Sequence, residues 1–164
     1  MEIREMLKSD WDEVSRIYQD GIDTNLATFE GEIPDYQSFD KKHFKECRYV
    51  LLDNHKIVAW ALLQPISNRK VYSGVAEVSI YVDMKSQGKG YGSYLLHYLI
   101  QKSEEHGFYM LQSGIMSNNL KSRKLHQKCG FRLVGEREKI AKDQNGNYRS
   151  MVIMERRSQL EKYL

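Results

Sequence analysis

Gln87-Gly88-Lys89-Gly90-Tyr91-Gly92-Ser93 is the stretch from which the fold is best deduced, because it joins a predicted strand to a predicted helix. Glycines let a backbone approach a ligand closely, and a helix N-terminus offers free N–H groups and a positive dipole end. The stretch matches neither common nucleotide motif: the Rossmann pattern needs a glycine where Ser93 stands, and the P-loop pattern is absent. A phosphate-binding loop and a tight turn without a ligand therefore both stay open.

Hydrophobic periodicity and turn residues divide the rest of the chain into short elements. Ser9 and Asp12 fit a capping box at the start of a helix, and Asn54-His55-Lys56 and Asn145-Gly146 fit hairpin turns. We expect strands over 2–6, 48–53, 57–64, 75–82, 108–116, 131–140 and 148–156, and helices over 9–21, 35–46, 91–106 and 119–128.

The order of these elements is not the regular strand–helix alternation of a Rossmann fold or a TIM barrel. It predicts an α/β (α+β) fold with a mixed, mostly antiparallel sheet of about seven strands, flanked by about four helices. Because 164 residues without a linker or repeat suit one core, we expect a single domain over 1–164.

Composition excludes several functional classes. The chain has 25 Lys plus Arg against 22 Asp plus Glu, and a net charge of +3 gives no argument for nucleic acid. The longest apolar run, residues 57–63, is far shorter than a membrane span, and the charged N-terminus is not a secretory signal. Cys47 and Cys129 make no disulfide framework, and His126 with Cys129 supplies too few ligands for a metal. We expect a reduced cytoplasmic protein without a metal or a membrane partner.

Two motifs carry a resemblance to a known family. Residues 87–92 resemble the Q/R-x-x-G-x-G/A motif of the GCN5-related N-acetyltransferases (the GNAT fold), and residues 119–131 resemble that family's N-x-x-S-x-x-L-x-x-x-x-G-F motif. The resemblance implies acetyl-CoA as co-substrate, with the glycine loop on its pyrophosphate and the preceding strand along its pantetheine arm. It also implies a homodimer. The implied cofactor-binding residues are Ile80, Tyr81, Val82, Gln87, Gly88, Lys89, Gly90, Tyr91, Gly92, Ser93, Asn119 and Ser122.

Further segments resemble the phosphinothricin N-acetyltransferase branch of that family. They are Thr28-Phe29-Glu30, Arg69-x-x-Tyr72, residues 76–82 and Asn145-Gly146-Asn147-Tyr148. Members of this branch acetylate the α-amine of small amino-acid-like acceptors, including phosphinothricin, methionine sulfoximine and methionine sulfone. The resemblance implies a small-molecule amine as the acceptor.

The expected acetyl transfer needs a general base to deprotonate the acceptor amine. An α-amine with a pKa of about 8 is roughly one-tenth neutral at pH 7, so its deprotonation costs only about 1.4 kcal/mol and one carboxylate suffices. Glu77 is the candidate: it shares a strand face with Ser79 and Tyr81, and the resemblance makes it catalytic. The alternative is an exposed or ion-paired Glu.

His126 is the second catalytic candidate, because histidine transfers protons near neutral pH and the branch carries His there. The alternative is a packed or surface histidine. A backbone N–H near Val82 is the candidate oxyanion donor. The remaining histidines, 43, 55, 97 and 106, are expected at the surface.

Four residues are candidates for binding the acceptor. Arg69 with Tyr72 suits a carboxylate or phosphoryl-like group, with a solvated loop as the alternative. Phe29 and Glu30 are candidates to close the pocket, although Phe29 also suits a loop anchor. Among the basic residues near the motifs, Lys89, Lys121 and Arg123 fit either the cofactor's phosphates or an ordinary solvated surface.

Two other functions stay open. One is a protein or peptide N-terminal acetyltransferase, which an open acceptor groove would favour. The other is a non-catalytic acyl-CoA-binding sensor. Nucleic-acid binding is disfavoured, because the sequence has no basic stripe interleaved with aromatic residues.

Overall fold

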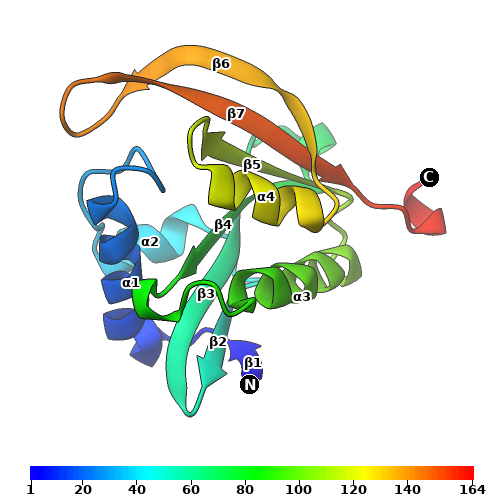
Figure 1. The fold of residues 1–164 in the computed structure, drawn as a ribbon. Helices are drawn as coiled ribbons and strands as arrows, with labels where there is room; N and C mark the ends of the chain where they lie inside the picture. Colours follow the sequence, from blue (N-terminus) through cyan, green and yellow to red (C-terminus); the bar gives the residue numbers. More distant parts are fainter.

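The computed structural model describes residues 1–164 and places seven strands in one sheet, in the order β1-β2-β3-β4-β5-β7-β6 (Figure 1). Only β4 and β5 are parallel; every other neighbouring pair is antiparallel. The expected mixed, mostly antiparallel sheet is therefore confirmed. The strands are β1 (Glu2–Glu5), β2 (Tyr49–Asp53), β3 (Lys56–Pro65), β4 (Val75–Val82), β5 (Met110–Met116), β6 (Arg132–Lys142) and β7 (Tyr148–Arg157), and the helices are α1 (Trp11–Asp23), α2 (Tyr36–Lys42), α3 (Tyr91–Glu105) and α4 (Leu120–Lys128).

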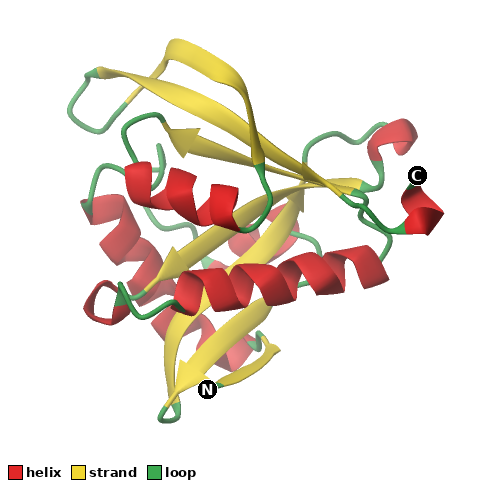
Figure 2. Ribbon diagram, turned by 45° about the vertical axis from the view of Figure 1, so that its right-hand side comes forward, coloured by secondary structure: helices red, strands yellow, loops and turns green.

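Helices cover both faces of the sheet, and two apolar clusters hold them there (Figure 2). On one face, α1 and α2 pack on Trp60 and Leu62 of β3. On the other face, α3 packs on Val78 of β4, with Ile80 and Val82 beside it. Alternate residues of a strand point to opposite faces, so β4 sends Tyr81 to the α1 side. The two-faced pattern deduced for residues 77–82 is thus confirmed for the side chains that the clusters contain.

The parallel pairing of β4 with β5 is short. It runs from Val75↔Met110 to Glu77↔Gln112, and beyond that pair the two strands separate (Figure 1). β4 continues to Val82 and β5 to Met116 without pairing to each other. Backbone groups on the β5-facing edge of residues 78–82 are therefore left for another partner.

Turn residues act as their sequence suggests. Asn54 and His55 both have positive φ (49° and 65°), which a two-residue hairpin turn of the primed type requires. Gly107 and Gly130 have positive φ after α3 and α4, as expected for residues that end helices.

Two helix boundaries were wrong. Ser9 and Asp12 do not form the capping box: a 3₁₀ turn over Lys8–Asp10 precedes α1, and the Asp10 carboxylate accepts from the Leu7 N–H (2.7 Å) and from Arg4. The second helix ends at Lys42 instead of residue 46.

Tertiary contacts end that second helix early. His43 is already extended, and the Phe44 N–H donates to the Leu63 carbonyl of β3 (2.9 Å). The Arg48 guanidinium then binds the Asp40 carboxylate (2.6 Å) and the carbonyls of Asp40 and His43. These bonds replace the hydrogen bonds of a further helical turn. The helix therefore ends at Lys42, although the sequence that follows is compatible with helix.

None of the helices combines the length and apolar character that a bilayer crossing needs. Both Cys47 and Cys129 are buried and unpaired with each other. No three His, Cys, Asp or Glu side chains lie close enough together to bind a metal ion.

Candidate active site

A cavity of about 230 Å³ opens where β4 and β5 separate. Its wall combines β4 residues 77–81, β5 residues 113–116, the loop over residues 27–30, and side chains of all the helices except α3. Eight of the residues expected in the site lie on this wall: Phe29, Glu30, Glu77, Ile80, Tyr81, Asn119, Ser122 and His126.

Glu77 lies at the point where the strands part. It is half-buried, and its backbone forms the last pair with Gln112 of β5. Gln112 Nε2 also donates to Glu77 Oε2 (3.2 Å), which leaves Oε1 free and orients the carboxylate. The side chain is therefore held by one neutral donor rather than by an ion pair, and the residue lines the cavity.

His126 has a fixed tautomer. Its Nδ1–H donates to the Ser122 carbonyl one helical turn earlier (2.7 Å), so Nε2 carries a lone pair. The ring is 1% exposed and packs edge-on against Phe131, and Nε2 is buried without a hydrogen-bond partner. Burial lowers the pKa of His126. The site thus contains a neutral imidazole whose unprotonated Nε2 lacks a partner that a ligand or water would supply.

The glycine loop lies apart from this cavity, between β4 and α3. Gly88 and Gly90 have φ of 79° and 83°, in the region that glycine adopts without strain, and a Cβ at either would meet open space. The α3 N-terminus therefore follows an uncrowded turn rich in glycine. Tyr91 is buried and its hydroxyl donates to Asp53, so its side chain is already occupied and only its backbone remains for a ligand.

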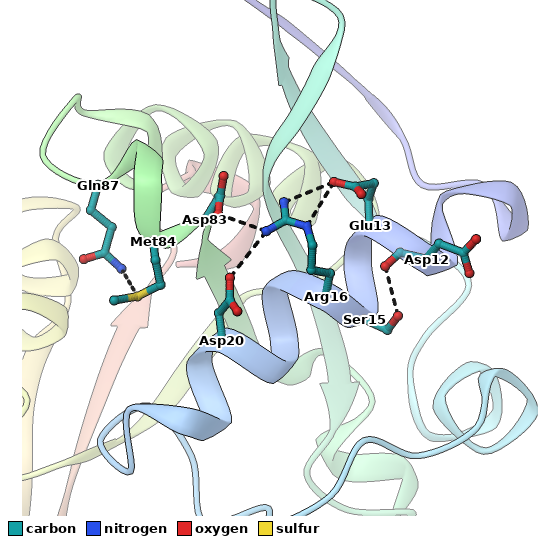
Figure 3. Close-up of polar contacts among 8 residues, drawn as sticks. All are labelled: Asp12, Glu13, Ser15, Arg16, Asp20, Asp83, Met84 and Gln87. Carbon is teal, nitrogen blue, oxygen red and sulfur yellow. Dashed lines mark hydrogen bonds and ion pairs between the residues drawn. The ribbon is translucent and has the colours of Figure 1, made fainter.

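The start of this loop is fixed to α1 through Asp83. Figure 3 shows Arg16 of α1 between Glu13 and Asp20 of its own helix and Asp83, which directly follows β4. Arg16 Nη1 lies 3.2 Å from Asp83 Oδ1, and the Asp83 N–H donates to the Val58 carbonyl (2.8 Å). These contacts set the direction in which the chain leaves β4 for the loop.

Asn119 caps α4 and joins it to the loop between α1 and α2, here called the cavity loop because its residues 27–30 line the cavity. Its Oδ1 accepts from the Ser122 N–H (3.2 Å), and its Nδ2 donates to the Leu26 carbonyl (3.3 Å). Side-chain caps of this kind satisfy one of the free N–H groups at a helix start. Its side chain is thus committed to structure. The Arg123 guanidinium is likewise used, because Nη1 donates to the Ser117 carbonyl (2.8 Å).

The cavity loop is also tied to the β6–β7 hairpin. Asn25 Nδ2 donates to Asp143 (3.1 Å), and Arg149 donates to both Asp143 (3.1 Å) and the Asn25 carbonyl (3.0 Å). Gln144 Nε2 donates to the Ile22 carbonyl (2.7 Å). These bonds hold the loop that brings Phe29 and Glu30 onto the cavity wall.

Arg69 and Tyr72 lie outside the cavity. Both are exposed at a 3₁₀ turn over Lys70–Tyr72, where the guanidinium lies 5.6 Å from the Tyr72 ring. The structure therefore does not bring them together with Glu77 and His126, and their role in acceptor binding stays a prediction.

His43 and an aromatic wall are features of the cavity that were not expected from the sequence. His43 was expected at the surface, which is wrong: it is half-buried and lines the cavity, as do Tyr18, Phe39 and Trp60. Trp60 stacks on Tyr81 with ring centroids 4.7 Å apart. The four-residue spacing of Phe39 and His43 was the available signal, because it puts both on one side of a helix.

His43 leads to a prediction about acid stability. Burial lowers its pKa to about 4, with smaller effects of Lys42 and Arg48 in the same direction. Between that value and the ordinary pKa of about 6.5, the unfolded chain binds a proton there that the folded chain does not. The melting temperature should therefore fall as pH is lowered from about 6.5 to 4. Calorimetric melting across this range should show a shallower fall in His43→Phe, whereas the exposed-site variant His106→Phe should keep the wild-type slope.

Comparison with known proteins adds independent information. A model of the acetyltransferase (GNAT) family matches residues 4–131. YwnH of Bacillus subtilis, whose name assigns it provisionally as a phosphinothricin acetyltransferase, is 38% identical over 79 residues, 48% of this chain and 48% of that protein. An L-methionine sulfoximine/L-methionine sulfone acetyltransferase of Pseudomonas paraeruginosa is 33% identical over 69 residues, 42% of this chain and 40% of that protein. The chain thus spans about half the length of the curated relatives it matches, or less.

One solved structure has the same fold over nearly the whole chain. It is described as a GNAT superfamily phosphinothricin acetyltransferase from Sinorhizobium meliloti in complex with AcCoA. The TM-score is 0.86 at 24% identity, over 95% of this chain and 87% of that one.

Proposed function

The chain belongs to the GNAT acetyltransferase family, and from that premise we propose that it transfers the acetyl group of acetyl-CoA to the primary amine of a small amino-acid-like acceptor. One observation carries the proposal: the gap between β4 and β5 brings the Glu77 carboxylate and the unpartnered Nε2 of His126 onto the wall of one cavity. Family membership supplies the reaction, and this pairing supplies groups to perform it.

The residues present fit acetyl-CoA. The glycine turn at residues 88–90 and the α3 N-terminus suit a pyrophosphate, because backbone N–H groups and the helix dipole both favour anions. The unpaired edge of β4 over Ile80–Val82 suits an amide-bearing arm laid beside it like a strand. Gln87, Lys89, Gly92 and Ser93 complete the proposed phosphate side, and Ser122 lies beside His126 on the thiol side.

Bound acetyl-CoA would supply the thioester carbon that the amine attacks and the thiol that leaves. Glu77 would take a proton from the acceptor's ammonium, directly or through a water, so that the neutral amine is at hand. A backbone N–H near Val82 would donate to the oxygen that becomes negative during attack.

The thiolate that leaves needs a proton, and His126 can carry one. Its Nε2 is unprotonated at rest, so it would first accept the proton that the attacking nitrogen loses on forming the amide, and then donate it to the sulfur. A depressed pKa makes the imidazolium a ready donor. No covalent enzyme intermediate is needed, and neither cysteine takes part.

Phosphinothricin, methionine sulfoximine and methionine sulfone are the proposed acceptor class, acetylated at the α-amine. The names of the two curated relatives support this class. Phe29 and Glu30 would close over the acceptor from the loop. Arg69 and Tyr72 would bind its acidic group only if the acceptor, or a partner copy, reached their exposed turn. The homodimer, the cytoplasmic location and the single domain over 1–164 stay predictions from the sequence.

Two other functions are kept as outcomes of the test. A protein N-terminal acetyltransferase would accept short peptides, and an acyl-CoA sensor would bind acetyl-CoA without turnover. The small cavity walled by the 27–30 loop favours a small acceptor over a peptide.

The test is thiol release from acetyl-CoA, measured with free amino acids, methionine sulfone, methionine sulfoximine, phosphinothricin, polyamines and short peptides. Turnover with the sulfur or phosphorus compounds is the expected result. Turnover only with peptides would replace the small acceptor with a protein substrate. Acetyl-CoA binding, checked by calorimetry, with no turnover across the panel would contradict catalysis and leave the sensor.

A further inference from the structure

The cavity loop, which joins α1 to α2, lines two cavities. Its residues 27–30 line the cavity between β4 and β5, and its residues 30–34 line a second cavity of about 480 Å³. His43 lies on the wall of both. The loop contains no helix or strand, so its place over the site depends on contacts with other segments. Arg149 of β7, which lines neither cavity, joins the loop to two of those segments.

The hydrogen bonds that attach the cavity loop to distant segments are concentrated at its start. The N–H groups of Leu26 and Glu30 donate to threonine hydroxyls two residues earlier (3.2 and 3.1 Å), and such local bonds shape turns without placing the loop. All hydrogen bonds to distant segments are made by Asn25 and by the Leu26 carbonyl. Residues 27–30 therefore follow an anchor at residues 25–26.

Arg149 joins this anchor to a second wall of the cavity. Its Nη1 donates to the Asn25 carbonyl (3.0 Å) and to Asp143 Oδ2 (3.1 Å), and its Nη2 donates to Asn118 Oδ1 (2.8 Å). Asn118 directly precedes Asn119, the cap of α4, which lines the cavity. One guanidinium thus links the cavity loop to the start of α4, and its planar fork of donors sets the geometry of that link.

Asp143 holds the guanidinium in place. Its Oδ1 accepts from the N–H groups of Asn145 and Asn147 in the hairpin turn (2.9 and 3.0 Å), and its Oδ2 accepts from Arg149 and from Asn25 Nδ2 (both 3.1 Å). Burial alone would raise the pKa of Asp143, but the donors of Asn147, Asn25 and Arg149 lower it to about 2. The carboxylate is therefore ionised at neutral pH and keeps its cation.

Asn25, where the link meets the loop, has an unfavourable conformation. Its φ is 52°, in the left-handed region that a side chain with a Cβ adopts at a cost. Its Oδ1 is also buried without a hydrogen-bond partner. Such costs persist only where the surroundings hold a residue in place. We therefore expect Asn25 to leave this conformation without the bonds from Arg149, and residues 27–30 to move with it.

We propose that Arg149 is a positioning residue for the acceptor: by linking Asn25 to Asn118, it keeps the cavity loop where Phe29 and Glu30 can bind the acceptor. This rests on the proposed function. Loss of an interaction that is equally strong in the ground state and the transition state raises KM and leaves kcat unchanged. Arg149 therefore acts on the KM of the acceptor.

The start of α4 is less dependent on this link than the loop is. Leu125 packs against the main apolar cluster, and the His126 ring packs on Phe131. The Arg123 guanidinium also donates to the Ser117 carbonyl (2.8 Å). When the link is broken, the loop rather than α4 should move, so the groups proposed for proton transfer keep their places.

Arg149→Lys is the test variant. Lysine keeps a positive charge beside Asp143, but a single ammonium does not reproduce the bonds of a planar fork to Asn25 and Asn118. Thiol release is measured with the best acceptor of the amine panel. We expect the acceptor KM to rise about tenfold, which corresponds to about 1.4 kcal/mol, and kcat to change by no more than about twofold. The calorimetric Kd for acetyl-CoA should stay at the wild-type value.

Arg156→Lys is the matched control. Arg156 lies on the same strand, its side chain is 23% exposed against 17% for Arg149, and it pairs with Glu104 (2.9 Å) without lining either cavity. The acceptor KM of this variant should stay at the wild-type value. Melting curves check that both variants fold. If Arg149→Lys does not fold, Asp143→Asn carries the same test, because an amide keeps one oxygen for the hairpin turn but does not accept from Arg149 as well.

An unchanged acceptor KM in folded Arg149→Lys would overturn the inference, as would an equal rise in Arg156→Lys or an equal rise in the Kd for acetyl-CoA. If the wild type turns over no amine, the proposed function fails and hydrogen–deuterium exchange decides about Arg149. The amides of residues 24–30 must then exchange about tenfold faster in Arg149→Lys than in the wild type, with residues 119–128 unchanged. Equal exchange in the loop would refute the positioning role.

Discussion

Glu77→Gln is expected to lower kcat/KM for the acceptor by about 10²–10⁴-fold, the range that general-base groups typically contribute. The substitution keeps the size of the side chain and its place at the end of the β4–β5 pairing, but removes the group that takes the amine proton. Because the base is needed only for the ammonium form, the deficit should shrink as pH rises past the amine pKa of about 8. The measurement is thiol release across pH 6–10 at saturating acetyl-CoA.

The matched control is Glu136→Gln, which removes an exposed carboxylate on β6 and should leave kcat/KM unchanged. Acetyl-CoA affinity should be the same in both variants, because Glu77 is not assigned to the cofactor. Near-normal turnover by Glu77→Gln throughout that pH range would remove Glu77 as the base. A loss of acetyl-CoA binding in step with the rate would instead make Glu77 a cofactor-site residue.

Leu99→Ala is expected to cost about 2–5 kcal/mol of folding free energy, as large-to-small substitutions in a packed core do. Leu99 of α3 is 0% exposed in the cluster that attaches α3 to the sheet. For a protein of this size, 1 kcal/mol shifts the melting temperature by about 2–4 °C. The midpoint should therefore fall by on the order of 10 °C, as measured by calorimetry.

Leu133→Ala removes the same atoms from a β6 side chain that is 49% exposed, so its midpoint should move by no more than about 1–2 °C. Similar shifts in the two variants would show that α3 is not held by this core. Activity per folded molecule of Leu99→Ala at 20 °C should stay near the wild-type value, since Leu99 lines neither cavity.

Much of the fold could be predicted from the sequence, because turn conformations and side-chain alternation depend on neighbouring residues. Asn54-His55 formed the expected positive-φ hairpin turn, and Gly107 and Gly130 ended α3 and α4. Period-two patterning separated Val78 from Tyr81 on the two faces of β4. Where local and tertiary preferences competed, the tertiary one prevailed: the α2 sequence was compatible with helix to residue 46, but Arg48 and β3 drew the chain out after Lys42.

The site residues likewise include some that could be predicted from the sequence and one that could not. Phe29, Glu30, Glu77 and His126 were named from spacing and resemblance, and all four line one cavity. His43 was assigned to the surface, although its four-residue spacing from Phe39 puts both on one side of the predicted helix. Its bond to the Phe39 carbonyl is local, but its place on the wall of two cavities is a tertiary property, because those walls include residues distant in sequence.

The order of strands and helices, the strand faces, the glycine turn before α3 and the family could all be predicted from the sequence, since they depend on side-chain period, turn propensity and short motifs. Tertiary packing sets where β4 and β5 part, how deeply His43 and His126 are buried, and that Arg69 and Tyr72 lie outside the cavity. The reason is physical. Burial sets a pKa, and a strand pairing ends, through groups that folding brings together from distant parts of the chain.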